Sequence, residues 1–98
     1  MNASFAIQLL PSVEREKLLP VVDEVIAYIQ SHGLKTVVGP FETVIEGDFD
    51  QLIEILRGCC KVCVEAGAPS LMSYVKISYN PGGDGFLTIA DKIDKYSK

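Results

Sequence analysis

Residues 34–47, LKTVVGPFETVIEG, contain two short β-rich runs that meet at a tight turn. Gly39 and Pro40 separate the runs, because glycine and proline favour turns and interrupt strands. The runs Leu34–Val38 and Glu42–Gly47 therefore predict two strands joined in a hairpin. This hairpin lies between two segments of helical periodicity, and that arrangement determines the topology that we predict for the whole chain.

A helical pattern precedes the hairpin. Apolar side chains recur every three or four residues from about Glu16 to His32, which is typical of an amphipathic helix. Pro20 is expected in the first turn, where backbone amides lack partners, and Gly33 is expected to end the helix. The recurring apolar residues are Leu18, Val21, Val22, Val25, Ile26 and Ile29.

A second helical pattern follows the hairpin. Asp48 is expected to cap the N-terminus of this helix, with Gln51 completing a capping box. Gly67 is expected to end the helix, and Pro69 prevents it from resuming. The side chains at helical spacing are Phe49, Leu52, Ile53, Leu56, Cys60 and Cys63.

Alternating apolar segments lie near both ends of the chain. Ser4–Leu10 and Leu71–Tyr79 alternate as strands do, so we predict a first and a fourth strand there. Thr88 and Asp91 are expected to cap a last short helix. The residues on one side of that helix would be Ile89, Ile93 and Tyr96.

The predicted order of elements is therefore β-α-β-β-α-β, followed by the short helix. Two right-handed βαβ crossovers around one hairpin give a ferredoxin-like sandwich. We expect a single α+β domain over residues 1–98, with an antiparallel sheet of strand order 4-1-3-2 and an extra C-terminal helix. Two helices would cover one face of the sheet, and the other face would stay open.

The composition restricts the classes of protein to consider. The chain has 98 residues, 48% of them hydrophobic, and a formal net charge of −4. An acidic chain is unsuited to neutralising nucleic-acid phosphates. No apolar run approaches the roughly 20 residues that span a bilayer, and Ser4–Leu10 lacks the basic flank of a secretory signal. The three cysteines, all within Cys59–Cys63, form no disulfide framework and fit the reducing cytoplasm, where we expect the protein.

A polar centre is expected on the open sheet face. Strand alternation places Gln8, Glu46 and Lys76 on this face, and it places Tyr74 beside them on the fourth strand. An amide, a carboxylate and an ammonium group on an apolar floor suit a small heteroaromatic ligand, whose polar edge needs donors and acceptors. The alternative is an ion pair that is solvated or lies between subunits.

The residues that most often carry catalysis give no enzyme site. Cys60 and Cys63 form a C-x-x-C pattern in mid-helix, whereas a reactive thiol of this kind needs the helix N-terminus. A zinc site would need more ligands than one histidine and this cysteine pair supply. His32 is expected in the last helical turn, where the helix dipole favours it without a catalytic role. We therefore expect no catalytic residues, no bound metal and no cofactor.

Several short strings follow one another in order along nearly the whole chain. They are Ile7–Pro11 (IQLLP), Gly33–Lys35 (GLK), Val38–Pro40 (VGP), Thr43–Phe49 (TVIEGDF), Ala66–Pro69 (AGAP) and Thr88–Lys92 (TIADK). In these strings the sequence resembles the small thiamine-binding, YkoF-like family, also called MTH-type or UPF0045 proteins. The Val-Gly-Pro and Thr-x-x-Glu-Gly segments are the most specific part of the resemblance.

The resemblance implies a ferredoxin-like fold that pairs through its sheets into homodimers, often assembled as dimers of dimers (homotetramers). It also implies binding of thiamin or its hydroxymethylpyrimidine moiety without catalysis. The matching motif carries Thr43 and Glu46 into the candidate site, and Ser12 is a candidate for its rim. Thr43 and Glu46 differ by three positions and so fall on opposite faces of a regular strand. Both would reach one ligand only if the strand contained a bulge or if the site lay at the beginning of the strand.

Two functions follow as expectations. The first is a non-catalytic cytoplasmic protein that binds thiamin or hydroxymethylpyrimidine for carriage, storage or sensing. Glu46 would accept a hydrogen bond from the pyrimidine amino group, and Lys76 or Gln8 would donate to ring nitrogens. The alternative is a ferredoxin-like structural or regulatory oligomerisation module without a thiamin ligand. The candidate ligand-binding residues are Gln8, Ser12, Thr43, Glu46, Tyr74 and Lys76.

Overall fold

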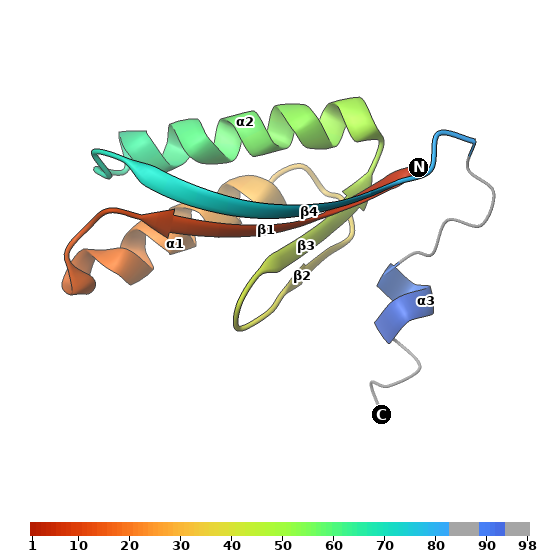
Figure 1. The fold of residues 1–98 in the computed structure, drawn as a ribbon. Coiled ribbons are helices and arrows are strands. Elements are labelled where there is room, and N and C mark those ends of the chain that lie inside the picture. The colour runs from red at the N-terminus through yellow and green to blue at the C-terminus, as the bar shows by residue number, and fades with distance from the viewer. Residues whose placement is uncertain (83–88, 94–98) are drawn as a thin grey trace.

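A computed structural model describes residues 1–82 and 89–93 of the chain (Figure 1). The sheet has the order β2-β3-β1-β4, and all neighbouring strands are antiparallel. This is the predicted order 4-1-3-2, so the α+β ferredoxin-like fold is confirmed. The elements are β1 (Ala3–Pro11), α1 (Arg15–Gln30), β2 (Thr36–Val38), β3 (Thr43–Gly47), α2 (Phe49–Glu65), β4 (Leu71–Tyr79) and α3 (Ile89–Ile93).

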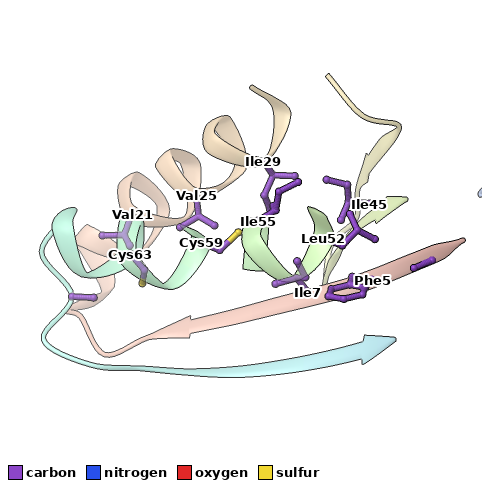
Figure 2. Close-up of a cluster of buried hydrophobic side chains, with 12 residues drawn as sticks. Phe5, Ile7, Val21, Val25, Ile29, Ile45, Leu52, Ile55, Cys59 and Cys63 are labelled. Atoms are coloured by element: carbon purple, nitrogen blue, oxygen red, sulfur yellow. The ribbon is translucent and has the colours of Figure 1, made fainter. Parts of the chain in front are cut away.

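The core lies between one face of the sheet and the helices α1 and α2 (Figure 2). Alternate residues of β1 and β3 point toward the helices, as period-two strands require. The two helices approach each other closely at Gly58, because a Cβ there would collide with the hydroxyl of Tyr28. The largest fully buried side chains are Phe5, Ile29, Ile45, Leu52, Ile55, Cys59 and Cys63.

The helix boundaries are close to those predicted from the sequence. Helix α1 begins at Arg15, one residue before the predicted start, so Pro20 is its sixth residue and lies just beyond the first turn. Gly33 and Gly67 have φ angles of 70° and 116°, a backbone conformation that favours glycine. Both residues therefore act as the predicted stops after α1 and α2.

The predicted capping box at the start of α2 is wrong. The side chain of Asp48 makes no capping hydrogen bond. Instead, the Asn2 side-chain oxygen accepts a hydrogen bond from the backbone N–H of Phe49 at 3.0 Å. The Asp48 carboxylate lies 3.0 Å from the N-terminal ammonium group of Met1. The Asp48 carboxylate thus forms an ion pair with Met1, and Asn2, which is distant in sequence, caps the helix.

The sheet face opposite α1 and α2 is not wholly open, contrary to the prediction. Figure 1 shows α3 on the other side of the sheet from α2. Ile89 of this helix is buried, and its backbone N–H donates to Glu46 Oε2 at 2.7 Å. The predicted capping residue Thr88 and the predicted packing residue Tyr96 lie outside the described residues. We find no helix in the described ranges that is long and apolar enough to cross a membrane.

Candidate functional site

Part of the predicted polar centre is present on the sheet face opposite α1 and α2. Gln8 pairs with Tyr74 across β1 and β4, and Lys76 pairs with Ala6 on the next rung of the same face. Lys76 Nζ lies 3.3 Å from Glu42 Oε1, just before β3. The structure therefore brings Gln8, Tyr74 and Lys76 together, with Glu42 as the neighbouring carboxylate.

Glu46 lies apart from this polar centre. It pairs with Ser4 on β1, and Gln8 lies four positions further along that strand, a distance of about 13 Å. Only 7% of Glu46 is exposed, and its carboxylate accepts the hydrogen bond from the N–H of Ile89. The carboxylate expected to bind the ligand is thus engaged by the chain's own C-terminal helix.

Thr43 and Ser12 do not join the polar centre either. Thr43 pairs with Ile7, so its side chain lies on the helix side of the sheet, whereas Glu46 lies on the other side. The register of β1 and β3 is continuous from Ile7 to Ala3, and no bulge brings Thr43 and Glu46 to one face. Ser12 is exposed after β1, and its backbone N–H donates to the carbonyl of Ser70 at 2.9 Å.

A pocket of about 240 Å³ lies among α1, the β2–β3 turn and the part of β1 beyond Ile7, where β3 no longer pairs with β1, so residues from both faces of β1 line it. Thr43 is 93% shielded from solvent and is a polar residue among those that line the pocket. Most other lining side chains are aliphatic. They include Ile7, Leu9, Leu18, Leu19, Val21, Val22, Val25, Ile26 and Ile29, with Gln8, Phe41, Glu42 and Cys63 also contributing.

The rim of this pocket is unusually apolar. Leu10, Leu18, Leu19 and Phe41 all line it, and all are exposed to solvent. Exposed apolar side chains gathered around a concavity are typical of a ligand or partner site. The helical periodicity predicts that Leu18 is buried with the other apolar residues of α1. In the structure Leu18 is exposed and lines the pocket. A phenylalanine directly after Gly39 and Pro40, in a predicted turn, is the sequence feature that could have indicated this site.

The structure gives the cysteines a role in packing. Cys59 and Cys63 are buried on α2, and burial raises the pKa of both thiols. For Cys59 the pKa reaches about 12, with neighbouring thiolate charges as a smaller cause. Raised pKa values keep these sulfurs protonated and poorly nucleophilic. Within residues 1–82 and 89–93, no group of three or more His, Cys, Asp or Glu residues is placed to hold a metal ion.

His32 also has a local structural role. Its Nδ1 lies 2.9 Å from the backbone carbonyl of Tyr28, one helical turn earlier. The rings of His32 and Tyr28 pack edge to face, with centroids 4.8 Å apart. These contacts fix the imidazole against the end of α1.

The topology and the packing define a ferredoxin-like α+β protein with a pocket beside its first helix. The sequence model of the family described as thiamine-binding protein matches residues 5–97. The chain therefore belongs to the thiamine-binding protein family, which confirms the resemblance seen in its sequence.

Individual relatives agree with this assignment. The chain is 47% identical over 95 residues to a UPF0045 protein of Clostridium perfringens, with 97% of each chain covered. The crystal structure of a Streptococcus pneumoniae protein matches with a TM-score of 0.80 at 38% identity, covering 100% of both chains. A candidate thiamine biosynthesis or salvage protein of Thermotoga maritima matches with a TM-score of 0.86 at 31% identity, covering 98% of this chain and 99% of that one.

Proposed function

We propose that this protein binds thiamin, through its pyrimidine moiety, in the pocket between α1 and the β2–β3 turn, and releases it unchanged. Such a protein would serve in carriage, storage or sensing of the vitamin. Membership of the thiamine-binding family supports the ligand class. The observation that carries the choice of site is the pocket of about 240 Å³, which combines aliphatic walls with the polar residue Thr43.

The size and lining of the pocket suit one aromatic ring. Pockets for drug-sized ligands have volumes of roughly 300–1,000 Å³, so about 240 Å³ accommodates a single ring and its substituents. Val22, Val25 and Ile26 of α1 offer apolar surface to the faces of a flat ring. The Thr43 hydroxyl both donates and accepts, which matches the nitrogens and the amino group of an aminopyrimidine.

The side chains around the pocket favour binding without catalysis. Cys63 is a potential nucleophile among the lining residues, and burial raises the pKa of its thiol. A protonated thiol attacks poorly, because the thiolate is the reactive form. The only histidine of the chain is His32, whose ring contacts Tyr28 at the end of α1. The proposal is therefore reversible binding that needs no cofactor or metal.

Filling the pocket should weaken binding. We expect Val22→Phe to weaken the binding of thiamin and hydroxymethylpyrimidine at least about tenfold in titration calorimetry, because the added ring occupies the space that the ligand needs. Val64→Phe is the matched control, since Val64 is exposed on α2 and does not line this pocket. Unchanged affinity in Val22→Phe, with the fold intact by circular dichroism, would place the ligand elsewhere. Absence of binding to the wild-type chain at millimolar ligand would contradict the proposed function.

We also propose that the protein self-associates through the sheet face opposite α1 and α2. Leu10, Met72 and Tyr74 are exposed there, and each belongs to β1 or β4. Grouped apolar side chains on a sheet face are typical of an interface. This surface also supports the alternative function, an oligomerisation module, which a stable oligomer without thiamin affinity would favour.

Charging that face should dissociate the assembly. We expect Tyr74→Glu to lower the mass measured by sedimentation velocity, because a carboxylate buried in an apolar interface is strongly unfavourable. Val64→Glu, on the outer surface of α2, should leave the mass unchanged. Equal masses for wild type and Tyr74→Glu would exclude this face as the interface.

A further inference from the structure

The β2–β3 turn forms one side of the mouth of the pocket. The N–H of Gly39 donates to the carbonyl of Glu42 at 3.0 Å, which closes the turn. The turn is tight, since a Cβ on Gly39 would approach that same carbonyl oxygen to 3.0 Å. Phe41 and Glu42 both line the pocket. One short, closed turn thus places an aromatic ring and a carboxylate at the entrance.

Phe41 exposes a large apolar surface to water. Its side chain is 80% exposed, more than any other large apolar residue in the described part of the chain. A phenylalanine ring offers a flat face that attracts cations and other aromatic rings. A ligand ring at the pocket mouth would cover this face and remove its apolar surface from water.

Glu42 is the carboxylate that remains accessible to a ligand. Its partner is Lys76, at 3.3 Å, whose side chain is 80% exposed. An ion pair of this kind contributes little to stability and exchanges readily with other charges. Glu46, in contrast, is almost completely buried and holds the backbone of α3. Glu42, and not Glu46, is therefore the carboxylate that can contact a ligand.

We propose that Phe41 and Glu42 determine ligand specificity by selecting a cationic aromatic ring at the mouth of the pocket. This inference rests on the proposed function. Since the pocket holds about one ring, the pyrimidine of thiamin occupies it and the thiazolium lies between Phe41 and Glu42. Glu42 then exchanges Lys76 for the thiazolium charge. The site prefers thiamin over the neutral hydroxymethylpyrimidine for this reason.

Calorimetric titration of the wild type and four variants with thiamin and with hydroxymethylpyrimidine tests the inference. We expect Glu42→Gln to weaken thiamin binding about tenfold and to change hydroxymethylpyrimidine binding less than about twofold. Added salt should reduce the difference in thiamin affinity between the wild type and Glu42→Gln, because screening weakens the attraction between the Glu42 carboxylate and the thiazolium. Lys76→Gln should strengthen thiamin binding, since it removes the competitor for Glu42. Glu54→Gln, an acid-to-amide change on the outer surface of α2, is the matched control.

The outcomes separate this inference from the function on which it rests. If the wild type binds both compounds and Glu42→Gln binds thiamin equally well, the inference is overturned and the proposed function stands. Equal weakening of both ligands in Glu42→Gln also overturns it, because the effect would not depend on ligand charge. A larger loss of thiamin binding in Glu46→Gln than in Glu42→Gln returns the role to Glu46. If the wild type binds neither compound, both proposals fail.

Discussion

Replacing Phe5 by alanine is expected to lower the free energy of unfolding by about 3–5 kcal/mol. The ring of Phe5 is fully buried in the middle of β1 and packs edge to face on Phe49, with centroids 5.9 Å apart. It also lies between Ile45 of β3 and Ile77 of β4 in the sheet register. The substitution therefore removes a side chain on which three neighbouring elements pack, and leaves a cavity.

Urea unfolding followed by circular dichroism measures this effect. Small domains unfold with free energies of about 5–15 kcal/mol, so Phe5→Ala removes a large share of the total. We expect the midpoint to fall by at least about 1 M urea. Phe41→Ala makes the same chemical change at an exposed turn and should alter stability by no more than about 0.5 kcal/mol. Similar midpoints for the two variants would contradict the core that we describe.

The contrast between these two phenylalanines shows what the sequence reveals about the fold. Phe5 alternates with Ile7 in a strand, and that period assigns both residues to the buried face. Phe41 follows Gly39 and Pro40, where no period applies, so its exposure was not predicted. Strand order and the principal elements were predictable because hydrophobic periodicity and short connections leave few topologies.

Contacts between distant segments were not predictable in the same way. Asp48 has the local pattern of a helix cap, yet Asn2, 47 positions before Phe49, supplies the capping oxygen. Met1 in turn provides the ammonium group that pairs with Asp48. Local motifs describe which hydrogen bonds a segment needs, and the tertiary fold determines which residue meets the need.

The sequence also does not reveal which glutamate of the candidate site lies near Lys76. Alternation over the predicted strand Glu42–Gly47 places Glu42 and Glu46 on one face, since they differ by four positions. Only the pairing of Glu46 with Ser4 reveals that Glu42 is the carboxylate near Lys76. The sequence shows which face of a strand a side chain occupies. Which residue of the neighbouring strand lies beside it depends on the pairing register, which the sequence does not show.

The free energy of unfolding is also expected to fall as the pH rises above about 9, and Cys59 is a principal cause. Burial raises the pKa of the Cys59 thiol from its ordinary value of 9.0 to about 12, and charges at Cys60 and Cys63 act in the same direction. Below pH 9 both the folded and the unfolded chain keep this proton. Between pH 9 and 12 the unfolded chain loses it first, so the folded state is destabilised by up to about 1.4 kcal/mol per pH unit.

Urea unfolding of the wild type and Cys59→Ala between pH 8 and pH 11 isolates this contribution. Cys59→Ala is expected to be less stable at pH 8, because it creates a cavity, and to lose less stability with each pH unit. Groups whose pKa does not depend on Cys59 cancel in the difference, whereas the pKa of Tyr28 is raised by burial and, to a smaller extent, by the charge of Cys59. Cys60→Ala should keep most of the wild-type slope, since burial outweighs the Cys60 charge as the cause of the shift. Parallel curves for wild type and Cys59→Ala would refute the assignment.

The same burial makes Cys59 and Cys63 packing residues of the core whose thiols resist ionisation. A disulfide exchange or a nucleophilic attack begins with a thiolate. Cys59 and Cys63 of α2 belong to the buried core cluster (Figure 2), where a negative charge is poorly solvated. The raised pKa values are the expression of that burial. Folding therefore suppresses the reactive form of the thiols, and a steep loss of stability at alkaline pH is the measurable consequence.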